Sequence, residues 1–162
     1  MKRNSTRFYR IDLRNHSSSY ELEELIKELK KEKYANTSEA FYDIRELDRL
    51  PKYNNLTGIE KAARILYLNK TCYNGLYRVN SIGEFNTPFG RYKNPNIVNE
   101  VGLRAVSKYF NEADITFLSG DFESTVKGIK KGSVVYFDPP YAPVSKTSNF
   151  TGYNESGFGE EE

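Results

Sequence analysis

The stretch Val134-Val135-Tyr136-Phe137-Asp138-Pro139-Pro140-Tyr141 decides the fold class of this 162-residue chain. Its first four residues are apolar, which favours a strand buried on both faces, as in a parallel sheet. Residues 115–118 form an earlier β-prone run, and residues 122–129 favour a short helix capped by Asp121. Strand, helix and strand in this order predict a βαβ unit. Asp138 then lies beyond the carboxyl end of a strand, where parallel sheets bind ligands.

Residues 138–141 also admit a plainer interpretation. Two prolines fix φ and remove two backbone donors, so the tetrapeptide would serve as a rigid turn without any chemistry. A specified tetrapeptide arises by chance in a chain of this length about once in a thousand. Because this one directly follows the expected strand, we treat it as a candidate catalytic loop.

The first part of the chain is expected to form helices. Apolar residues recur at helical spacing within residues 21–32, which predicts an amphipathic helix with a charged outer face. Asn36 is followed three residues later by Glu39, a spacing that favours a second helix start. The apolar stripe that follows ends before Pro51.

A third helix and a hairpin come next. Thr57 and Glu60 have the spacing of a capping box, which predicts a helix over residues 57–70. Turn-forming residues recur every few positions in residues 71–96 and favour a hairpin-like region. Residues 97–110 are again helical in pattern. The candidates for the buried side of this last helix are Val98, Val101, Leu103, Val106 and Phe110.

Charge is segregated along the chain. Residues 20–48 hold nine acidic side chains against five basic ones. Residues 64–95 hold five basic side chains against one acidic one, with six aromatic residues interleaved. The five basic residues are Arg64, Lys70, Arg78, Arg91 and Lys93. Cations that meet phosphates and rings that stack on bases are typical of nucleic-acid readers, although an ordinary solvated loop has the same composition.

Composition excludes several classes of protein. The 18.7 kDa chain is 38% hydrophobic and 28% charged, with a mean hydropathy of −0.71 and no apolar run of membrane-spanning length. One cysteine, Cys72, and one histidine, His16, exclude an internal disulfide and a Cys/His zinc set, and no metal site is expected. The basic N-terminus lacks the apolar stretch of a secretory signal, so a cytoplasmic location is the default expectation.

Two groups of residues carry a resemblance. The first group resembles the target-recognition segment of Dam-type DNA adenine-N6 methyltransferases. It consists of Cys72-Tyr73-Asn74-Gly75-Leu76-Tyr77-Arg78-Val79-Asn80 and Pro88-Phe89-Gly90-Arg91-Tyr92-Lys93, together with residues 67–70 and 83–86. Residues 138–143 and 149–153 resemble the catalytic loop of the same family. The resemblance implies an α/β fold: a partial Rossmann-like, S-adenosylmethionine-dependent methyltransferase sheet with an inserted helical and hairpin target-recognition region.

The resemblance assigns catalysis to Asp138, Pro139, Pro140 and Tyr141. Adenine N6 is a poor nucleophile because its lone pair is delocalised into the ring. Asp138 and the Pro139 carbonyl would each accept one N6 hydrogen and so orient that pair. Tyr141 would stack on a base flipped out of the duplex. Asp121 and Phe122, together with Asp138, would contact S-adenosylmethionine.

The resemblance also implies a DNA-binding set within the hairpin. Arg78 is the leading candidate to contact a guanine edge, and Tyr73 looks like a ring inserted beside the displaced base. The full set is Tyr73, Asn74, Leu76, Arg78, Asn80, Pro88, Arg91 and Lys93. For each residue, hairpin packing or phosphate contact is the alternative. The motif set resembles family members that methylate adenine in GATC.

One family motif is missing. The first 56 residues contain no glycine, so the glycine-rich turn that opens the family's cofactor pocket is absent. The expected organisation is a basic segment over residues 1–19, a target-recognition region over 20–110 and a partial catalytic region over 111–162. We therefore expect a methyltransferase chain truncated at both ends.

Several functions remain compatible with such a chain. The first is adenine-N6 methylation of duplex DNA. The alternatives are an inactive DNA-binding module, or one half of a split enzyme whose complementary fragment carries the glycine-rich segment. Methylation of RNA or of a protein amide is disfavoured, because glutamine-amide methyltransferases usually carry Asn at the position of Asp138.

Overall fold

The structure is a computed structural model, and it describes residues 18–113, 115 and 126–136. The chain divides into two compact units, Ile11–Asp114 and a second one made of Met1–Arg10 and Ile115–Glu162. The first unit contains the four α-helices of the described residues: α1 (Ser18–Leu29), α2 (Ser38–Glu46), α3 (Gly58–Thr71) and α4 (Glu100–Glu112). Short 3₁₀ turns join them: η1 (Glu32–Tyr34), η2 (Leu47–Arg49), η3 (Pro51–Asn55) and η4 (Tyr73–Gly75).

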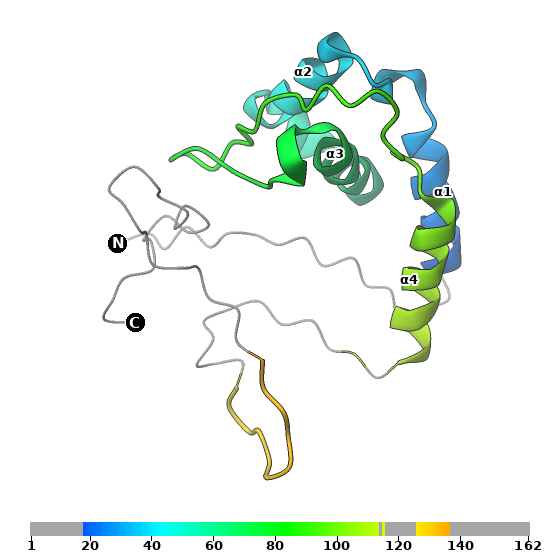
Figure 1. Cartoon of the computed structure of the whole chain (residues 1–162), viewed down its shortest axis with the longest axis vertical. Helices are drawn as coiled ribbons and strands as arrows, with labels where there is room; N and C mark the ends of the chain where they lie inside the picture. Colours follow the sequence, from blue (N-terminus) through cyan, green and yellow to red (C-terminus); the bar gives the residue numbers. More distant parts are fainter. Residues whose placement is uncertain (1–17, 114, 116–125, 137–162) are drawn as a thin grey trace. The chain divides into compact units, whose positions relative to one another are not determined.

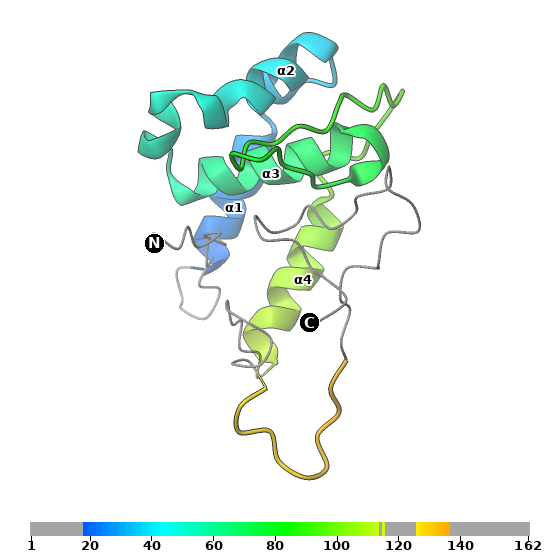
Figure 2. The ribbon, with the colours of Figure 1, turned by 90° about the vertical axis from the view of Figure 1, so that its left-hand side faces the viewer.

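Helix α3 lies at the centre of this unit and packs against both α1 and α2 (Figures 1 and 2). Its Ala63, Tyr67 and Leu68 are fully buried. Phe41 of α2 and Phe85 of the following hairpin join them in one core. The hairpin therefore shares the hydrophobic core with the helices, which fixes its position on the unit.

The capping box predicted for α3 is confirmed. Thr57 Oγ1 accepts a hydrogen bond from Glu60 N at 3.2 Å, and the Glu60 carboxylate accepts one from Thr57 N at 2.9 Å. The start expected at Asn36 is wrong by one residue, because Thr37 caps α2 by accepting from Ala40 N. Asn36 instead donates its side-chain amide to Tyr92 O at 2.7 Å. The Asn36 side chain, which local spacing favoured as the cap, is thus used in a contact with a residue distant in sequence.

The buried side expected for the last helix is wrong in part. Helix α4 begins after Asn99, whose side chain accepts from Gly102 N, and the side chains of Val101 and Val106 are 83% and 50% exposed. Leu103 packs against the core, and Ser107 lies one turn further along and is buried. Val98 also packs against the core, as predicted, whereas Val101 and Val106 lie on the exposed side of α4.

The hairpin expected over residues 71–96 is confirmed. Isolated antiparallel bridges pair Cys72 with Phe89 and Val79 with Phe85. They are the only β pairings in the described ranges.

The βαβ unit remains a prediction. Residues 134–136 make no β pairing, and Val134 and Tyr136 are largely exposed. Of the run at 115–118, only Ile115 is described. Residues 126–128 form a turn in which Ile129 N donates to Val126 O, so the expected helical end at residue 129 is wrong.

Candidate nucleic-acid interface

The hairpin is closed by backbone hydrogen bonds from its base to its tip. Tyr73 N donates to Pro88 O at 2.8 Å, Asn86 N donates to Arg78 O at 2.9 Å, and Asn80 N donates to Glu84 O at 2.8 Å. These bonds hold the two arms of the hairpin side by side. All eight predicted DNA-binding residues lie on these arms or just beyond the second one.

The base of the hairpin depends on unusual backbone geometry. Asn74 and Gly75 both have positive φ, 53° and 64°, which produces the sharp turn after Tyr73. Asn74 N donates to the Tyr92 hydroxyl at 3.0 Å, which ties this turn to the end of the second arm. A Cβ atom on Gly90 would lie 2.7 Å from Cys72 O, so only glycine fits there. The turn leaves the Tyr73 ring 54% exposed.

The Cys72 thiol is buried beneath this turn and contacts Leu76 O at 3.5 Å. Burial raises the pKa of the thiol, so the neutral form is favoured and Cys72 is a packing residue. The neighbouring Leu76 side chain is partly exposed, at 38%.

Asn80 shapes the tip of the hairpin. Its side-chain oxygen accepts from Glu84 N at 2.9 Å and from Ile82 N at 3.2 Å. Its amide nitrogen donates to the Glu84 carboxylate at 2.8 Å. These bonds use the Asn80 side chain to close the turn, so contact with DNA would have to compete with them. The Ile82 side chain, which was given no role from sequence, is 72% exposed at the tip.

Arg78 lies on the first arm with its side chain exposed. Its Nε donates to the Asn86 side-chain oxygen at 2.7 Å, and Nη2 lies 3.3 Å from Asn86 O. Asn86 on the second arm therefore holds the guanidinium from one side. Asn86 falls within one of the motif blocks but was given no role from sequence, because its partner lies across the hairpin.

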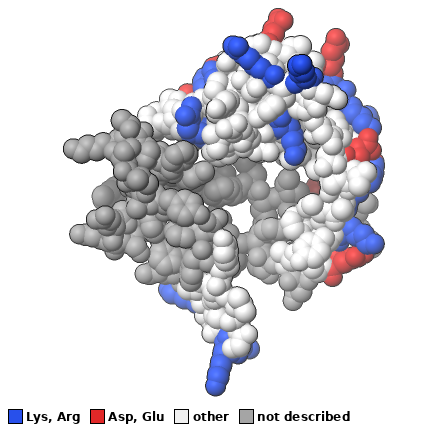
Figure 3. All heavy atoms as spheres, in the orientation of Figure 1, with Lys and Arg blue, Asp and Glu red and all other residues white. Residues whose placement is uncertain are grey.

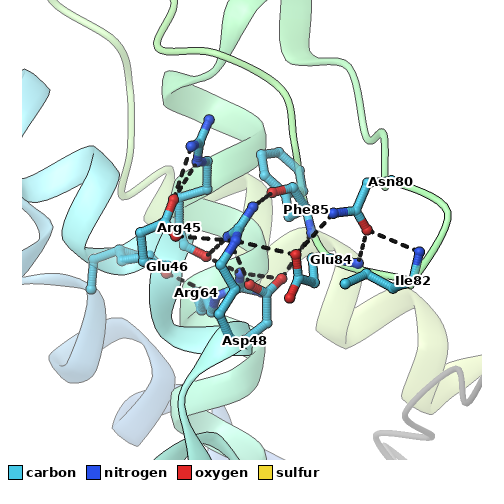
Figure 4. A network of polar contacts seen from close by, with 10 residues as sticks. Arg45, Glu46, Asp48, Arg64, Asn80, Ile82, Glu84 and Phe85 are labelled. Atoms are coloured by element: carbon cyan, nitrogen blue, oxygen red, sulfur yellow. Dashed lines mark hydrogen bonds and ion pairs between the residues drawn. The ribbon is translucent and has the colours of Figure 1, made fainter.

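A polar network ties the hairpin to the helices (Figure 4). The Asp48 carboxylate accepts from Phe85 N at 2.8 Å, and Arg49 donates to Phe85 O at 2.9 Å. Arg64 lies 2.7 Å from the same carboxylate and donates to Ile44 O at 2.9 Å. Figure 4 shows Arg64 of α3 and the backbone of Phe85 in the hairpin meeting at Asp48 of η2.

This network corrects the charge argument. Arg64 is only 2% exposed and neutralises Asp48 inside the unit, so it contributes nothing to a DNA-facing surface. Lys70, Arg78, Arg91 and Lys93 of the same segment are exposed. In Figure 3, Lys and Arg side chains lie on the upper part of the face, and acidic side chains stand at its upper rim. Along the edge formed by α1 and α4, acidic and basic side chains are mixed.

The remaining predicted site residues lie outside the described ranges. They are Asp121, Phe122, Asp138, Pro139, Pro140 and Tyr141. Among the residues that are described, no cluster of His, Cys, Asp and Glu could hold a metal ion. No helix in the same ranges has the length and apolar character needed to cross a membrane.

Comparison with known proteins gives one consistent family. The model of D12 class N6 adenine-specific DNA methyltransferases matches residues 2–162. A type II methyltransferase of Lactococcus lactis subsp. cremoris is 46% identical over 140 residues, which cover 86% of this chain and 49% of that protein. A type II methyltransferase of Methanocaldococcus jannaschii is 47% identical over 124 residues, with 76% and 42% covered.

A DNA adenine methylase of Serratia marcescens is 44% identical over 124 residues, which cover 76% of this chain and 43% of the methylase. The chain thus spans less than half the length of each of these relatives. Because the family model covers nearly all of the chain and bears out the resemblance carried by its hairpin and loop motifs, this protein belongs to the D12 class N6 adenine-specific DNA methyltransferases.

Proposed function

We propose that this chain carries the DNA-reading hairpin and the catalytic loop of an S-adenosylmethionine-dependent adenine-N6 methyltransferase. The observation that carries the proposal is the hairpin of the first unit, which exposes Arg78 and Tyr73 on a base anchored in the core. A rigid support lets an exposed cation and an exposed ring meet DNA without a large ordering cost.

In this proposal the hairpin reads the target. Arg78 pairs with a guanine edge, and Tyr73 inserts beside the displaced adenine. Arg91 and Lys93 are both exposed, and they contact DNA phosphates next to the bases that the hairpin reads. GATC is the proposed site, on the resemblance of the motif set to family members that methylate it.

Catalysis is proposed for residues 138–141. Methyltransferases of this family take the methyl group from S-adenosylmethionine. Asp138 and the Pro139 carbonyl accept the two N6 hydrogens, Pro140 stiffens the loop, and Tyr141 stacks on the flipped base. Asp121 and Phe122 contact the cofactor. The βαβ arrangement of a partial Rossmann-like sheet would bring these groups to one edge.

The catalytic role of Asp138 is tested by Asp138→Ala in a preparation of this sequence that transfers methyl groups. One charged acceptor at a transition state contributes about 2–4 kcal/mol, so we expect the rate to fall by a factor of roughly 30 or more. Methyl transfer that survives within about tenfold would reject this assignment.

A second candidate function is DNA binding without catalysis, or catalysis only with a complementary fragment. The absence of glycine from the first 56 residues favours it. Both candidates share the DNA-reading hairpin, so one binding experiment tests their common part.

The experiment measures binding of two duplexes, one with GATC and one with a single guanine of that site replaced, each at two salt concentrations. Arg78→Ala should reduce the preference for the GATC duplex by roughly 5- to 150-fold, because a bidentate base contact contributes about 1–3 kcal/mol. The matched control is Lys93→Ala, which should weaken both duplexes alike and flatten the salt dependence by about one unit of slope. Equal loss on both duplexes in Arg78→Ala would place Arg78 among the phosphate contacts.

A further inference from the structure

The guanidinium of Arg78 has two edges that can form paired hydrogen bonds. One edge carries Nε–H and an Nη2 hydrogen, and the other carries one hydrogen each from Nη1 and Nη2. Asn86 occupies the first edge with two acceptors, its side-chain oxygen at 2.7 Å from Nε and its own carbonyl at 3.3 Å from Nη2. No acceptor for Nη1 is present among the described residues. The second edge is therefore the one left to a ligand.

We propose that Asn86 is a positioning residue for base recognition, which holds Arg78 so that only its Nη1/Nη2 edge can pair with guanine O6 and N7. This inference rests on the proposed role of the hairpin in reading DNA. Held in this way, the long side chain loses less rotational freedom when it binds. It also presents one of its two paired edges, where a free arginine could present either.

The position of Asn86 is itself fixed by its neighbours. Asn86 N donates to Arg78 O at 2.9 Å, so the two residues face each other directly across the hairpin. The preceding residue, Phe85, is 2% exposed, and its N–H and C=O are held by Asp48 and Arg49 at 2.8 and 2.9 Å. Asn86 thus follows a residue whose N–H and C=O are both hydrogen-bonded to η2.

A competing role for Asn86 is direct contact with a DNA phosphate through its side-chain amide. The two roles make different demands on the side chain. Positioning needs only an acceptor that faces Nε of Arg78, whereas phosphate binding needs a donor. Asn86→Asp keeps the acceptor and removes the donor, and Asn86→Leu removes both at similar volume.

The experiment compares these two variants with the unsubstituted chain. It measures dissociation constants for a GATC duplex and for the same duplex with 7-deazaguanine, which lacks the N7 acceptor, in place of one guanine. The readout is the dissociation constant for the 7-deazaguanine duplex divided by that for the GATC duplex. We expect Asn86→Leu to reduce this ratio about fivefold or more. Asn86→Asp should keep that ratio within about twofold while weakening both duplexes through its added charge. Circular-dichroism melting checks that each variant folds.

Arg78→Ala completes a double-mutant cycle. If Asn86 acts through Arg78, Asn86→Leu should cause no further change in the ratio once Arg78 is alanine. An unchanged ratio in Asn86→Leu, equal weakening of both duplexes by that variant, or loss of the ratio in Asn86→Asp would each overturn the positioning role. If Asn86→Leu does not fold, Asn86→Ala, which also removes both the acceptor and the donor, replaces it in the comparison and in the cycle. If Arg78→Ala itself leaves the ratio unchanged, the proposed guanine contact fails, and the inference fails with it.

Discussion

Arg64 and Arg78 are the same amino acid in opposite environments. Arg78 is exposed and held by one neighbour, whereas Arg64 is 2% exposed and bonded to the Ile44 carbonyl, the Arg45 carbonyl and the Asp48 carboxylate. The carboxylate in turn holds the hairpin at Phe85 N. Both charges of a buried ion pair have lost their contact with water. Removal of one partner therefore leaves the other charge buried without compensation.

Arg64→Met should therefore destabilise the protein by about 3 kcal/mol, near the low end for a broken buried pair. The low end applies because Asp48 keeps Arg49 at 3.1 Å and Phe85 N at 2.8 Å as partners. The measurement is the urea unfolding midpoint at constant slope. The control is Lys70→Met on the same helix, whose exposed side chain should change stability by no more than about 0.5 kcal/mol. Equal effects of the two variants would contradict a buried role for Arg64.

The charge pattern could not separate these two arginines, although the resemblance assigned a role to Arg78 and none to Arg64. Both occur in a basic, aromatic segment, and nothing in the spacing of residues 64–78 indicates that Asp48 lies against one of them. The same limit applies to Asn86, whose partner lies across the hairpin. Roles that depend on a residue distant in sequence become visible only when the chain is folded.

At the scale of elements, the best predictions were those that depend on near neighbours. The α3 capping box involves residues three positions apart, and its geometry is that expected from the sequence. The hairpin between α3 and α4 was likewise predicted from its turn-forming residues. The predicted start of α2 was wrong because Asn36 bonds to Tyr92. The predicted buried side of α4 was wrong in part because this helix packs against α1.

The α3 capping box should make stability depend on pH. The hydrogen bond from Thr57 N holds the pKa of Glu60 below its ordinary value of 4.5. A carboxyl whose pKa is lowered by folding stabilises the protein above its unfolded pKa and loses that contribution as the pH falls through the folded value. Glu60→Gln keeps an acceptor but has no charge near the helix N-terminus.

We therefore expect Glu60→Gln to be less stable than the unsubstituted protein at pH 7 by about 0.5 kcal/mol. That difference should shrink towards zero as the pH falls well below 4.5, where Glu60 becomes protonated in both states. Urea unfolding of both proteins across this range measures it. A difference that stays constant down to about pH 3 would show that the charge of Glu60 plays no part in the cap.

At the scale of the whole molecule, the described helices and hairpin make a unit with its own core. Helices α1 and α4 are joined at their surface by ion pairs of Glu23 with Arg104 and of Lys30 with Glu100. Such exposed pairs contribute little to stability, and each helix also carries a buried residue, Ile26 on α1 and Ser107 on α4. The hairpin that displays Arg78 belongs to this unit, and the predicted catalytic and cofactor residues belong to the other.

This division leads to a prediction about ligands. The hairpin has a complete set of supporting contacts within residues 18–113, so we expect the 162-residue chain to bind duplex DNA. We expect no binding of S-adenosylmethionine at micromolar concentration. The resemblance assigns only Asp121, Phe122 and Asp138 to the cofactor, and the first 56 residues lack the glycines of the cofactor turn.

Isothermal titration of the chain with S-adenosylmethionine, and separately with a GATC duplex, checks both halves of this prediction. DNA binding without cofactor binding would favour a DNA-reading part that needs a complementary glycine-rich segment for catalysis. Micromolar cofactor binding would contradict the prediction and would mean that other residues of this chain form the pocket. Addition of the duplex before the cofactor is the stricter form of the test, because bound DNA could order a pocket that the free chain lacks.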